Sequence, residues 1–442
     1  MSSTPDAARR AVAEACERIA GCEPGIFIDH VDPTRALAAA ALVDAAVAAG
    51  ERRPLAGRTL AVKGNIDVAG HRTTAGCPTF GTVAERSAPA VRALEAAGAV
   101  VVAITNLDQF ATGLVGTRSP YGACPNAFWP DLVSGGSSSG SAVAVARGLV
   151  DVALGTDTAG SGRVPAAANG IVGVKPTPGR ISTNGLVPAC RSLDCVSTFA
   201  RTIDDAALVA DLAAGYDAAD PWSAPPQHPG PRTGPLRIGI PPPDALTFAG
   251  SPDGAPRFAT AVSAVLEATA GEPARVDLEP FLATGDLLYG GAFVAERYAA
   301  VGGFVDDHLD DVDPVVASII QAAGRLPAWH LARDRDHLAR LCRSTERTWA
   351  DCDVLVLPSV PRIPTTAEVA ADPLGPNAML GTYTNFVNLL GLCALTMPVE
   401  AAGPDHPPFS ITVIGPAWTD ALLASVARRI SERGSPASPR TP

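Results

Sequence analysis

Two glycine- and serine-rich turns and two lysines have residue types that could carry out catalysis. Residues 135–141 (GGSSSGS) precede a helical run, and residues 156–162 (TDTAGSG) follow a short apolar segment. Lysine occurs only at Lys63 and Lys175, because every other residue in the Lys+Arg count is arginine. Arginine keeps its proton whereas a buried lysine can lose it, so these two positions are candidates for a neutral amine.

Residues 135–141 alone are open to three interpretations. They could form a flexible linker, but they adjoin a strongly helical run. They could bind phosphate through backbone N–H groups, although the P-loop pattern requires a lysine in the turn. The pattern G-x-S-x-G could make Ser138 the nucleophile of a serine hydrolase, which also needs an acid and a downstream histidine. The downstream histidines lie in no characteristic context: His228, His308, His330, His337 and His406.

Composition excludes several classes of protein. The chain has 442 residues, 47% hydrophobic and 18% charged, which is enough apolar sequence for a large core. Its net charge of −11 argues against a nucleic-acid groove. We find neither a signal-peptide pattern nor an apolar stretch long enough to span a membrane. Nine scattered cysteines without a CxxC pair predict no disulfide framework and no zinc site. We therefore expect a cytoplasmic protein that needs no metal or organic cofactor.

Short apolar strands alternating with helices must position the two turns. We expect a strand over 58–62 that carries Lys63 at its end, and a strand over 152–155 that leads into the second turn. Another strand is expected over 100–104. Helices are expected over 5–21, 33–50, 88–98, 142–150 and 418–433. This alternation predicts an α/β layer architecture.

A proline-rich segment over 217–235 reads as a connection. Apolar segments over 236–240, 353–358 and 409–415 read as core strands like those before it. We therefore expect one continuous sheet in a single domain over 1–435, with a helical insertion after the connection and a disordered tail over 436–442. The alternative is two independent domains.

Taken together, these segments resemble the amidase signature family. The family's marks are a Gly-Gly-Ser-Ser turn, here containing Ser137, and a nucleophilic serine in a second turn, here Ser161. The supporting segments AVKGNIDVAG, which contains Lys63, and GIVGVKPTPGRIS also match, and the resemblance runs from about residue 25 to 430. It implies an α/β amidase-signature fold in which a central mixed β-sheet is flanked by helices on both faces.

The resemblance also implies roles for individual residues. Ser161 would form an acyl-enzyme and expel ammonia, while the cis-serine Ser137 would relay protons to a neutral Lys63. Backbone N–H groups would form the oxyanion hole at four positions: Thr158, Ala159, Gly160 and Ser161. Asp157 would brace the second turn, and Lys175 would be structural.

Within the family, the segments over 106–123, 188–197 and 381–399 resemble the allophanate hydrolases. Allophanate is a urea that carries a carboxylate, and the resemblance implies that Tyr289 and Arg297 bind this carboxylate. Both can reach one ligand only if Gly290 and Gly291 interrupt the helix between them, because eight helical residues span about 12 Å. The resemblance also implies that the backbone from Ala111 to Gly113 faces the substrate amide. Arg191 would be a second carboxylate partner or, more simply, a brace for Asp194 or a neighbouring loop.

The predicted reaction is hydrolysis of allophanate to ammonia and an N-carboxylated product that collapses to carbon dioxide and more ammonia. The resemblance suggests a homodimer. It also suggests a separate product-processing or carboxylase protein, because long allophanate hydrolases carry a further C-terminal domain. The alternatives are a broad small-amide amidase, an amidotransferase A-type subunit, a G-x-S-x-G serine hydrolase and a non-catalytic scaffold that binds anions.

Overall fold

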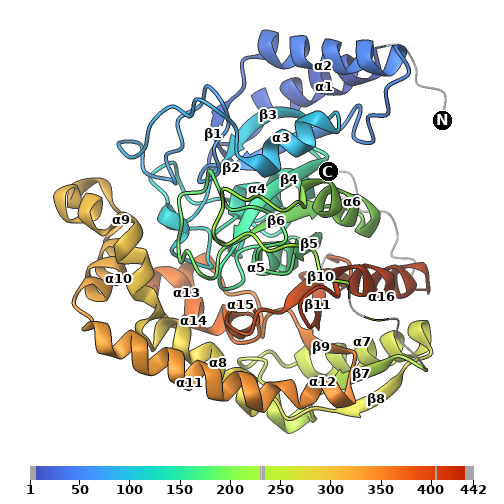
Figure 1. Cartoon of the computed structure of the whole chain (residues 1–442), viewed down its shortest axis with the longest axis vertical. Coiled ribbons are helices and arrows are strands. Elements are labelled where there is room, and N and C mark those ends of the chain that lie inside the picture. Colours follow the sequence, from blue (N-terminus) through green and yellow to red (C-terminus); the bar gives the residue numbers. More distant parts are fainter. Residues whose placement is uncertain (1–5, 229, 231–233, 404–405, 434–442) are drawn as a thin grey trace.

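The computed structural model describes residues 6–228, 230, 234–403 and 406–433. Eleven strands form one sheet within these residues. The strands are β1 (Phe27–His30), β2 (Thr59–Lys63), β3 (Val100–Thr105), β4 (Val152–Asp157), β5 (Val172–Lys175), β6 (Cys195–Ala200), β7 (Arg237–Ile240), β8 (Glu272–Arg275), β9 (Val354–Pro358), β10 (Cys393–Glu400) and β11 (Phe409–Gly415). Their spatial order is β1-β3-β2-β4-β6-β5-β10-β11-β9-β7-β8, as Figure 1 shows.

Sixteen α-helices accompany the sheet in the described residues. They are α1 (Ala7–Ala20), α2 (Pro33–Ala48), α3 (Pro89–Ala96), α4 (Ser139–Ala146), α5 (Arg163–Ala168), α6 (Ile203–Ala213), α7 (Gly254–Thr269), α8 (Glu279–Tyr289), α9 (Ala295–Asp307), α10 (Pro314–Gly324), α11 (Ala328–Glu346), α12 (Thr348–Asp351), α13 (Thr366–Ala371), α14 (Gly375–Leu380), α15 (Asn385–Leu389) and α16 (Asp420–Arg433). None of them, over the part of the chain that is described, is both long and apolar enough to cross a bilayer.

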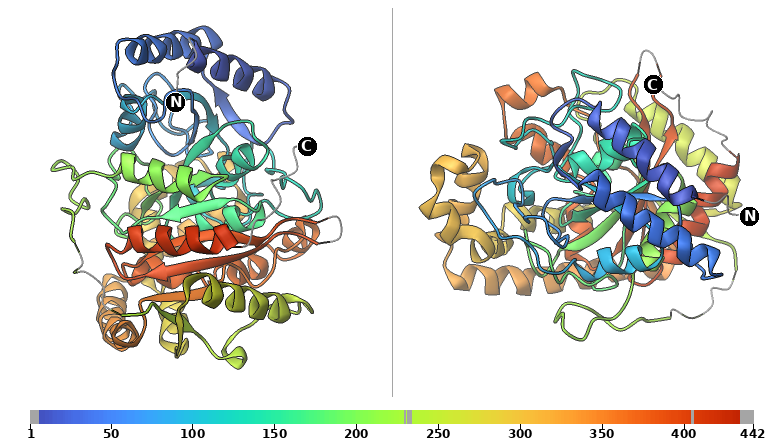
Figure 2. Two further views of the ribbon diagram at one scale, coloured as in Figure 1. Left: turned by 90° about the vertical axis from the view of Figure 1, so that its right-hand side faces the viewer. Right: turned by 90° about the horizontal axis from the view of Figure 1, so that it is seen from above.

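The sheet is mixed, as predicted. β2 pairs in parallel with β3 and β4, whereas β4 pairs antiparallel with β6 and β10 pairs antiparallel with β5 and β11. Helices α6 and α16 cover one face, and α4 and α5 cover the other (Figure 1). Figure 2 shows α6 (green) and α16 (red) next to each other on this face of the sheet. The predicted fold class is confirmed.

Burial on both faces explains why the central strands are almost continuously apolar. Every residue of β2, β3, β4 and β6 is buried, which is typical of strands covered by helices on both sides. The predicted strands and helices are observed within a few residues, the largest difference being the helix predicted over 142–150, which is observed as α4 over Ser139–Ala146. The Gly/Ser turn therefore supplies the first turn of this helix.

Strands from both sides of the connection over 217–235 lie in this one sheet. β5, which precedes the connection, pairs with β10, which follows it, with Lys175 opposite Ala394. The helical segment from α8 to α12 lies between β8 and β9 and extends along the side of the sheet that carries α5 (Figure 1). Part of the connection and the predicted tail over 436–442 lie outside the described residues.

Candidate active site

Lys63 is the last residue of β2 and its side chain is fully buried. Its Nζ lies 2.8 Å from the Oγ of Ser137 and 2.7 Å from the Oγ1 of Thr156. Burial lowers the pKa of Lys63 to about 7, although nearby carboxylates, Asp108 foremost, act in the opposite direction. A large share of this amine is therefore neutral near pH 7, and its lone pair is available to accept a proton.

The turn over 135–141 places Ser137 against this amine. The peptide bond between Gly136 and Ser137 is cis. The neighbouring Ser138 has a different role, because its Oγ donates to the carbonyl oxygen of Thr156 at 3.0 Å and lies 3.3 Å from the Thr156 amide. Ser138 thus ties the first turn to the end of β4, where the second turn begins. A hydroxyl committed to the backbone in this way argues against Ser138 as a nucleophile.

Ser161 lies in the second turn, two residues before α5, and only 3% of its surface is exposed. Within the described residues its hydroxyl has no hydrogen-bond partner, so its oxygen is not committed to the protein. The described residues thus show no hydrogen bond between Ser161 and Ser137, and in ligand-free structures such a bond from a nucleophile to its base is often long.

Asp157 braces the second turn, as predicted. Its carboxylate accepts from the amides of Gly160 (2.9 Å) and Gly162 (3.0 Å) and forms a bidentate ion pair with Arg163 at 2.8 and 2.9 Å. Both charged side chains are fully buried. Burial alone would raise the pKa of Asp157, but Arg163 and the amides outweigh burial and lower it.

The four amides predicted to form an oxyanion hole differ in availability. The Gly160 amide is engaged by Asp157. The amides of Thr158, Ala159 and Ser161 have no acceptor among the residues described, so they remain free to donate. The Thr158 hydroxyl donates to Asp194 at 2.5 Å, which fixes this turn against the loop before β6.

Tyr289 and Arg297 meet because the helix between them is broken. α8 ends at Tyr289, Gly290 and Gly291 follow, and α9 begins at Ala295. The Nη2 of Arg297 lies 3.4 Å from the Tyr289 hydroxyl, and the guanidinium carbon lies 5.7 Å from the centre of the Tyr289 ring. The condition for a shared ligand is therefore met.

Arg297 is 2% exposed and makes no ion pair with any described carboxylate. Its Nη1 donates to the Oγ1 of Thr112 at 2.9 Å and to the carbonyl oxygen of Ala111 at 3.3 Å. The adjacent Glu296 accepts from the amide and hydroxyl of Ser192 instead. A buried guanidinium without a carboxylate partner is an unusual arrangement, because an unpaired buried charge is costly.

The loop from Asp108 to Arg118 lies against Arg297, because it carries the Ala111 and Thr112 atoms that the guanidinium contacts. Asp108 accepts from the amides of Val115, Gly116 and Arg118 and so folds the loop around its carboxylate. The amide of Gly113 has no acceptor within the described residues. A Cβ at Gly113 would lie 2.5 Å from the Oδ2 of Asp108, so glycine is required here for steric reasons.

Arg191 does not join this group. It donates to the carbonyl oxygen of Thr183 at 3.1 Å and pairs with Asp220 at 3.4 Å, which makes it a brace for a neighbouring loop. The alternative of a second carboxylate partner is not supported. Lys175 is structural as predicted, because its Nζ donates to the carbonyl oxygen of Pro176 at 2.7 Å.

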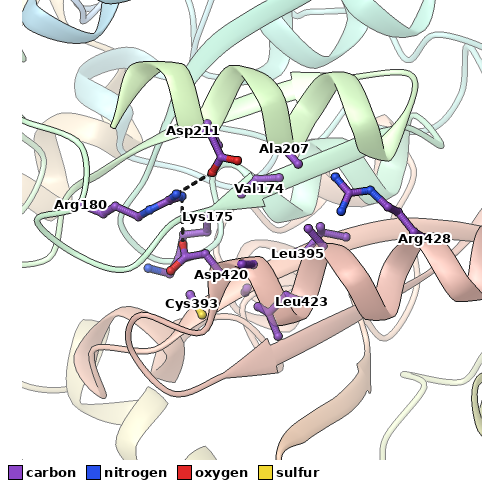
Figure 3. Close-up of a pocket in the computed structure, with 14 residues that line it drawn as sticks. Val174, Lys175, Arg180, Ala207, Asp211, Cys393, Leu395, Asp420, Leu423 and Arg428 are labelled. Atoms are coloured by element: carbon purple, nitrogen blue, oxygen red, sulfur yellow. Dashed lines mark hydrogen bonds and ion pairs between the residues drawn. The ribbon is translucent and has the colours of Figure 1, made fainter. Parts of the chain in front are cut away.

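A cavity of about 80 Å³ lies between α6 and α16, away from these residues (Figure 3). Three of its charged groups are paired with one another, because Arg180 contacts Asp211 at 2.6 Å and Asp420 at 3.6 Å. Of the other two charged groups, Arg428 pairs with Asp204 and Lys175 donates to a backbone carbonyl. Neither of the two turns lines this cavity. It therefore does not compete with the Lys63 region as a candidate catalytic centre.

Sequence reasoning missed the residues that hold these groups in place. Thr156 begins the second turn, and Asn65 follows Lys63 closely, so their positions in the motifs were a usable signal. Asn65 donates to the Thr156 hydroxyl at 3.4 Å and to the carbonyl oxygen of Val187 at 3.2 Å. Thr112 carried no signal, because its contact with Arg297 joins distant parts of the chain.

The chain is similar to known proteins in sequence and in overall structure. The chain is 44% identical over 395 residues to the urea amidolyase of Lachancea kluyveri, covering 88% of this chain and 21% of that protein. It is 43% identical over 394 residues to the urea amidolyase of Saccharomyces cerevisiae, covering 88% and 21% of the two chains. The Kluyveromyces lactis allophanate hydrolase structure has a TM-score of 0.91 and 38% identity, covering 100% of this chain and 72% of that one.

The chain thus spans about a fifth of the length of the urea amidolyases that it matches. The family model described as Amidase matches residues 10–424, which include both turns, Lys63 and the segment that carries Arg297. The chain belongs to the amidase family.

Proposed function

We propose that this protein hydrolyses allophanate, with Ser161 as the nucleophile. The observation that carries the proposal is the buried guanidinium of Arg297, which faces Tyr289 and no described carboxylate. A substrate carboxylate would complete this site through charge-assisted hydrogen bonds. The resemblance to allophanate hydrolase and to the urea amidolyases supports this choice of substrate within the family.

In the proposed mechanism, neutral Lys63 accepts a proton from Ser137 while Ser137 accepts one from Ser161. The Ser161 oxygen then attacks the terminal amide carbonyl of allophanate. Free amides of the second turn donate to the developing oxyanion, a large electrostatic contribution in acyl transfer. Ser137 returns a proton to the leaving nitrogen, ammonia departs and an acyl-enzyme forms.

A water molecule then attacks the acyl-enzyme, with Lys63 accepting its proton through Ser137. The bond from the acyl carbon to the Ser161 oxygen breaks, Lys63 returns its proton to that oxygen through Ser137, and N-carboxycarbamate is released. This product takes up two protons and loses two molecules of carbon dioxide, which leaves a second ammonia. The protein residues supply positioning, proton transfer and electrostatic stabilisation for these steps.

We also propose a cytoplasmic location, a homodimer and a separate protein that processes the product or carboxylates urea. All nine cysteines are free thiols, which fits a reducing compartment. The homodimer and the separate protein rest on the family resemblance.

The test is the yield of ammonia per allophanate consumed by the purified chain. We expect two ammonia molecules per allophanate, no turnover in Ser161→Ala, and a strongly raised KM for allophanate in Arg297→Gln with neutral amides unaffected. Faster hydrolysis of simple aliphatic amides than of allophanate would favour a broad small-amide amidase. Turnover that survives in Ser161→Ala but not in Ser138→Ala would instead assign the reaction to a G-x-S-x-G hydrolase.

A further inference from the structure

The nitrogen atoms of the Arg297 guanidinium differ in whether they already have hydrogen-bond acceptors within the protein. Both hydrogen-bond contacts of Nη1 are made within the protein, to Thr112 and to Ala111. Nη2 has one contact, at 3.4 Å to the Tyr289 hydroxyl. Nε and the second N–H of Nη2 have no acceptor in the described parts of the chain. The Nε–H and the adjacent N–H of Nη2 lie on one edge of the planar guanidinium, the edge that Nη1 does not share, and a carboxylate can accept from such a pair in bidentate fashion.

Thr112 accepts from Nη1 and so determines which edge of the Arg297 guanidinium remains free to bind a ligand. Its hydroxyl has a single hydrogen, which it donates to the carbonyl oxygen of Phe110 at 3.2 Å. A lone pair of the same oxygen therefore faces the Nη1 of Arg297 at 2.9 Å. Thr112 is 1% exposed, so water cannot readily replace it as the acceptor. The contact with the Ala111 carbonyl oxygen is longer, at 3.3 Å.

The segment around Thr112 is itself held in place. Its carbonyl oxygen accepts from the Nη1 of Arg118 at 2.9 Å, and its amide donates to the carbonyl oxygen of Gln109 at 3.0 Å. Phe110 and Ala111 both adopt left-handed backbone conformations, with φ of 52°. A loop anchored at so many points has little freedom to move another acceptor toward Arg297.

We propose that Thr112 is a positioning residue that orients Arg297 so that its Nε–Nη2 edge faces the carboxylate of the substrate. This inference rests on the proposed function for the identity of that substrate. Selectivity for a carboxylated amide then depends on the Thr112 hydroxyl, which does not itself contact the reacting atoms.

The test compares Thr112→Val, which keeps the shape and removes the acceptor, with Thr112→Ser, which keeps the hydroxyl. We expect Thr112→Val to raise KM for allophanate by about 10-fold or more, the size of a lost hydrogen bond to a charged group, with kcat changed much less. The Thr112→Ser variant should keep KM for allophanate within about 2-fold of the wild-type value. Labelling of Ser161 by a neutral serine-directed phosphonate should proceed equally fast in all three proteins and so report an intact catalytic centre.

Protection of Ser161 from this label by malonate separates the two proposals. Malonate carries a carboxylate but no amide, so its binding does not require turnover. A weaker protection in Thr112→Val than in Thr112→Ser, in a protein that releases no ammonia from allophanate, would support the positioning role and overturn the proposed substrate. Equal KM values and equal protection in the two variants would overturn the positioning role. So would an absence of malonate protection in the wild-type protein.

Discussion

The amine of Lys63 and the hydroxyls of Ser137 and Thr156 form a buried polar cluster at the end of β2. The chemistry of this amine depends on its surroundings, because the same side chain in water keeps its proton to a pH near 10.4. Asn65 donates to Thr156, which favours Thr156 as an acceptor for an N–H of Lys63. Neutral Lys63 then keeps one further N–H and its lone pair, and either can engage the Ser137 hydroxyl at 2.8 Å.

At the residue scale we predict that Lys63→Met abolishes most of the activity at every pH. Methionine matches the length of lysine but offers no basic lone pair, so the general base is lost. The expected loss in kcat is about 10²–10⁴-fold between pH 6 and 9, measured by ammonia release, with the near-UV circular dichroism unchanged. Activity within a few-fold of wild type would show that Lys63 is not the base.

The second turn shows how an element is held in a catalytic shape. Asp157 and Arg163 are both fully buried, and Arg163 also donates to the carbonyl oxygen of Thr384 and to Asn388. This network ties the turn between β4 and α5 to the segment before β10. The turn is therefore fixed by residues more than 200 positions away along the chain.

We predict that Asp157→Asn destabilises the protein by about 3–5 kcal/mol, because it leaves the Arg163 charge buried without its partner. Denaturant unfolding measures this change in free energy. The matched control is Asp204→Asn, which removes one partner of the solvent-exposed pair with Arg428 and should have a much smaller effect. Equal effects of the two substitutions would contradict the importance assigned to the buried pair.

The break between α8 and α9 yields a second prediction at the element scale. A Cβ at Gly291 would overlap the carbonyl oxygen of Leu287, so Gly291→Ala must shift the connection that sets Tyr289 against Arg297. We expect KM for allophanate to rise several-fold with a smaller change in kcat. Gly303→Ala, on α9, is the control because a Cβ there meets no atom within 4 Å. A KM for allophanate that is unchanged in Gly291→Ala would contradict a role of this connection in substrate binding.

Sequence reasoning predicted the elements with regular apolar patterns and the residues within recognisable motifs. Lys63 at a strand end, the two turns and the fold class belong to this group. It could not predict Thr112 as a partner of Arg297, because 185 positions separate them and threonine is common in loops. It also did not foresee that Asp157 would engage the Gly160 amide, since that contact depends on the three-dimensional shape of the turn.

At the scale of the whole molecule, one sheet joins segments from both sides of the proline-rich connection. The pairing of β5 with β10 lies in the middle of this sheet, so neither segment has a complete sheet without the other. Cys393 and Leu395 of β10 and Val172 and Val174 of β5 belong to the same buried apolar cluster. We therefore propose that the chain folds as one domain.

We predict that thermal and denaturant unfolding each show one transition, with tryptophan fluorescence and far-UV circular dichroism giving the same midpoint. A continuous core couples the two segments, so neither can unfold while the other stays native. Two separated transitions, or different midpoints from the two probes, would indicate two domains on either side of the connection.

The rate at which a serine-directed phosphonate labels Ser161, followed by peptide mapping from pH 5.5 to 9, tests the role of neutral Lys63 most directly. A depressed pKa of about 7 means that the amine gains its lone pair as the pH rises through neutrality. The rate should therefore rise through pH 7, level off above it, and be low and independent of pH in Lys63→Met. Labelling at Ser138, or a wild-type rate that does not change across this range, would contradict the account.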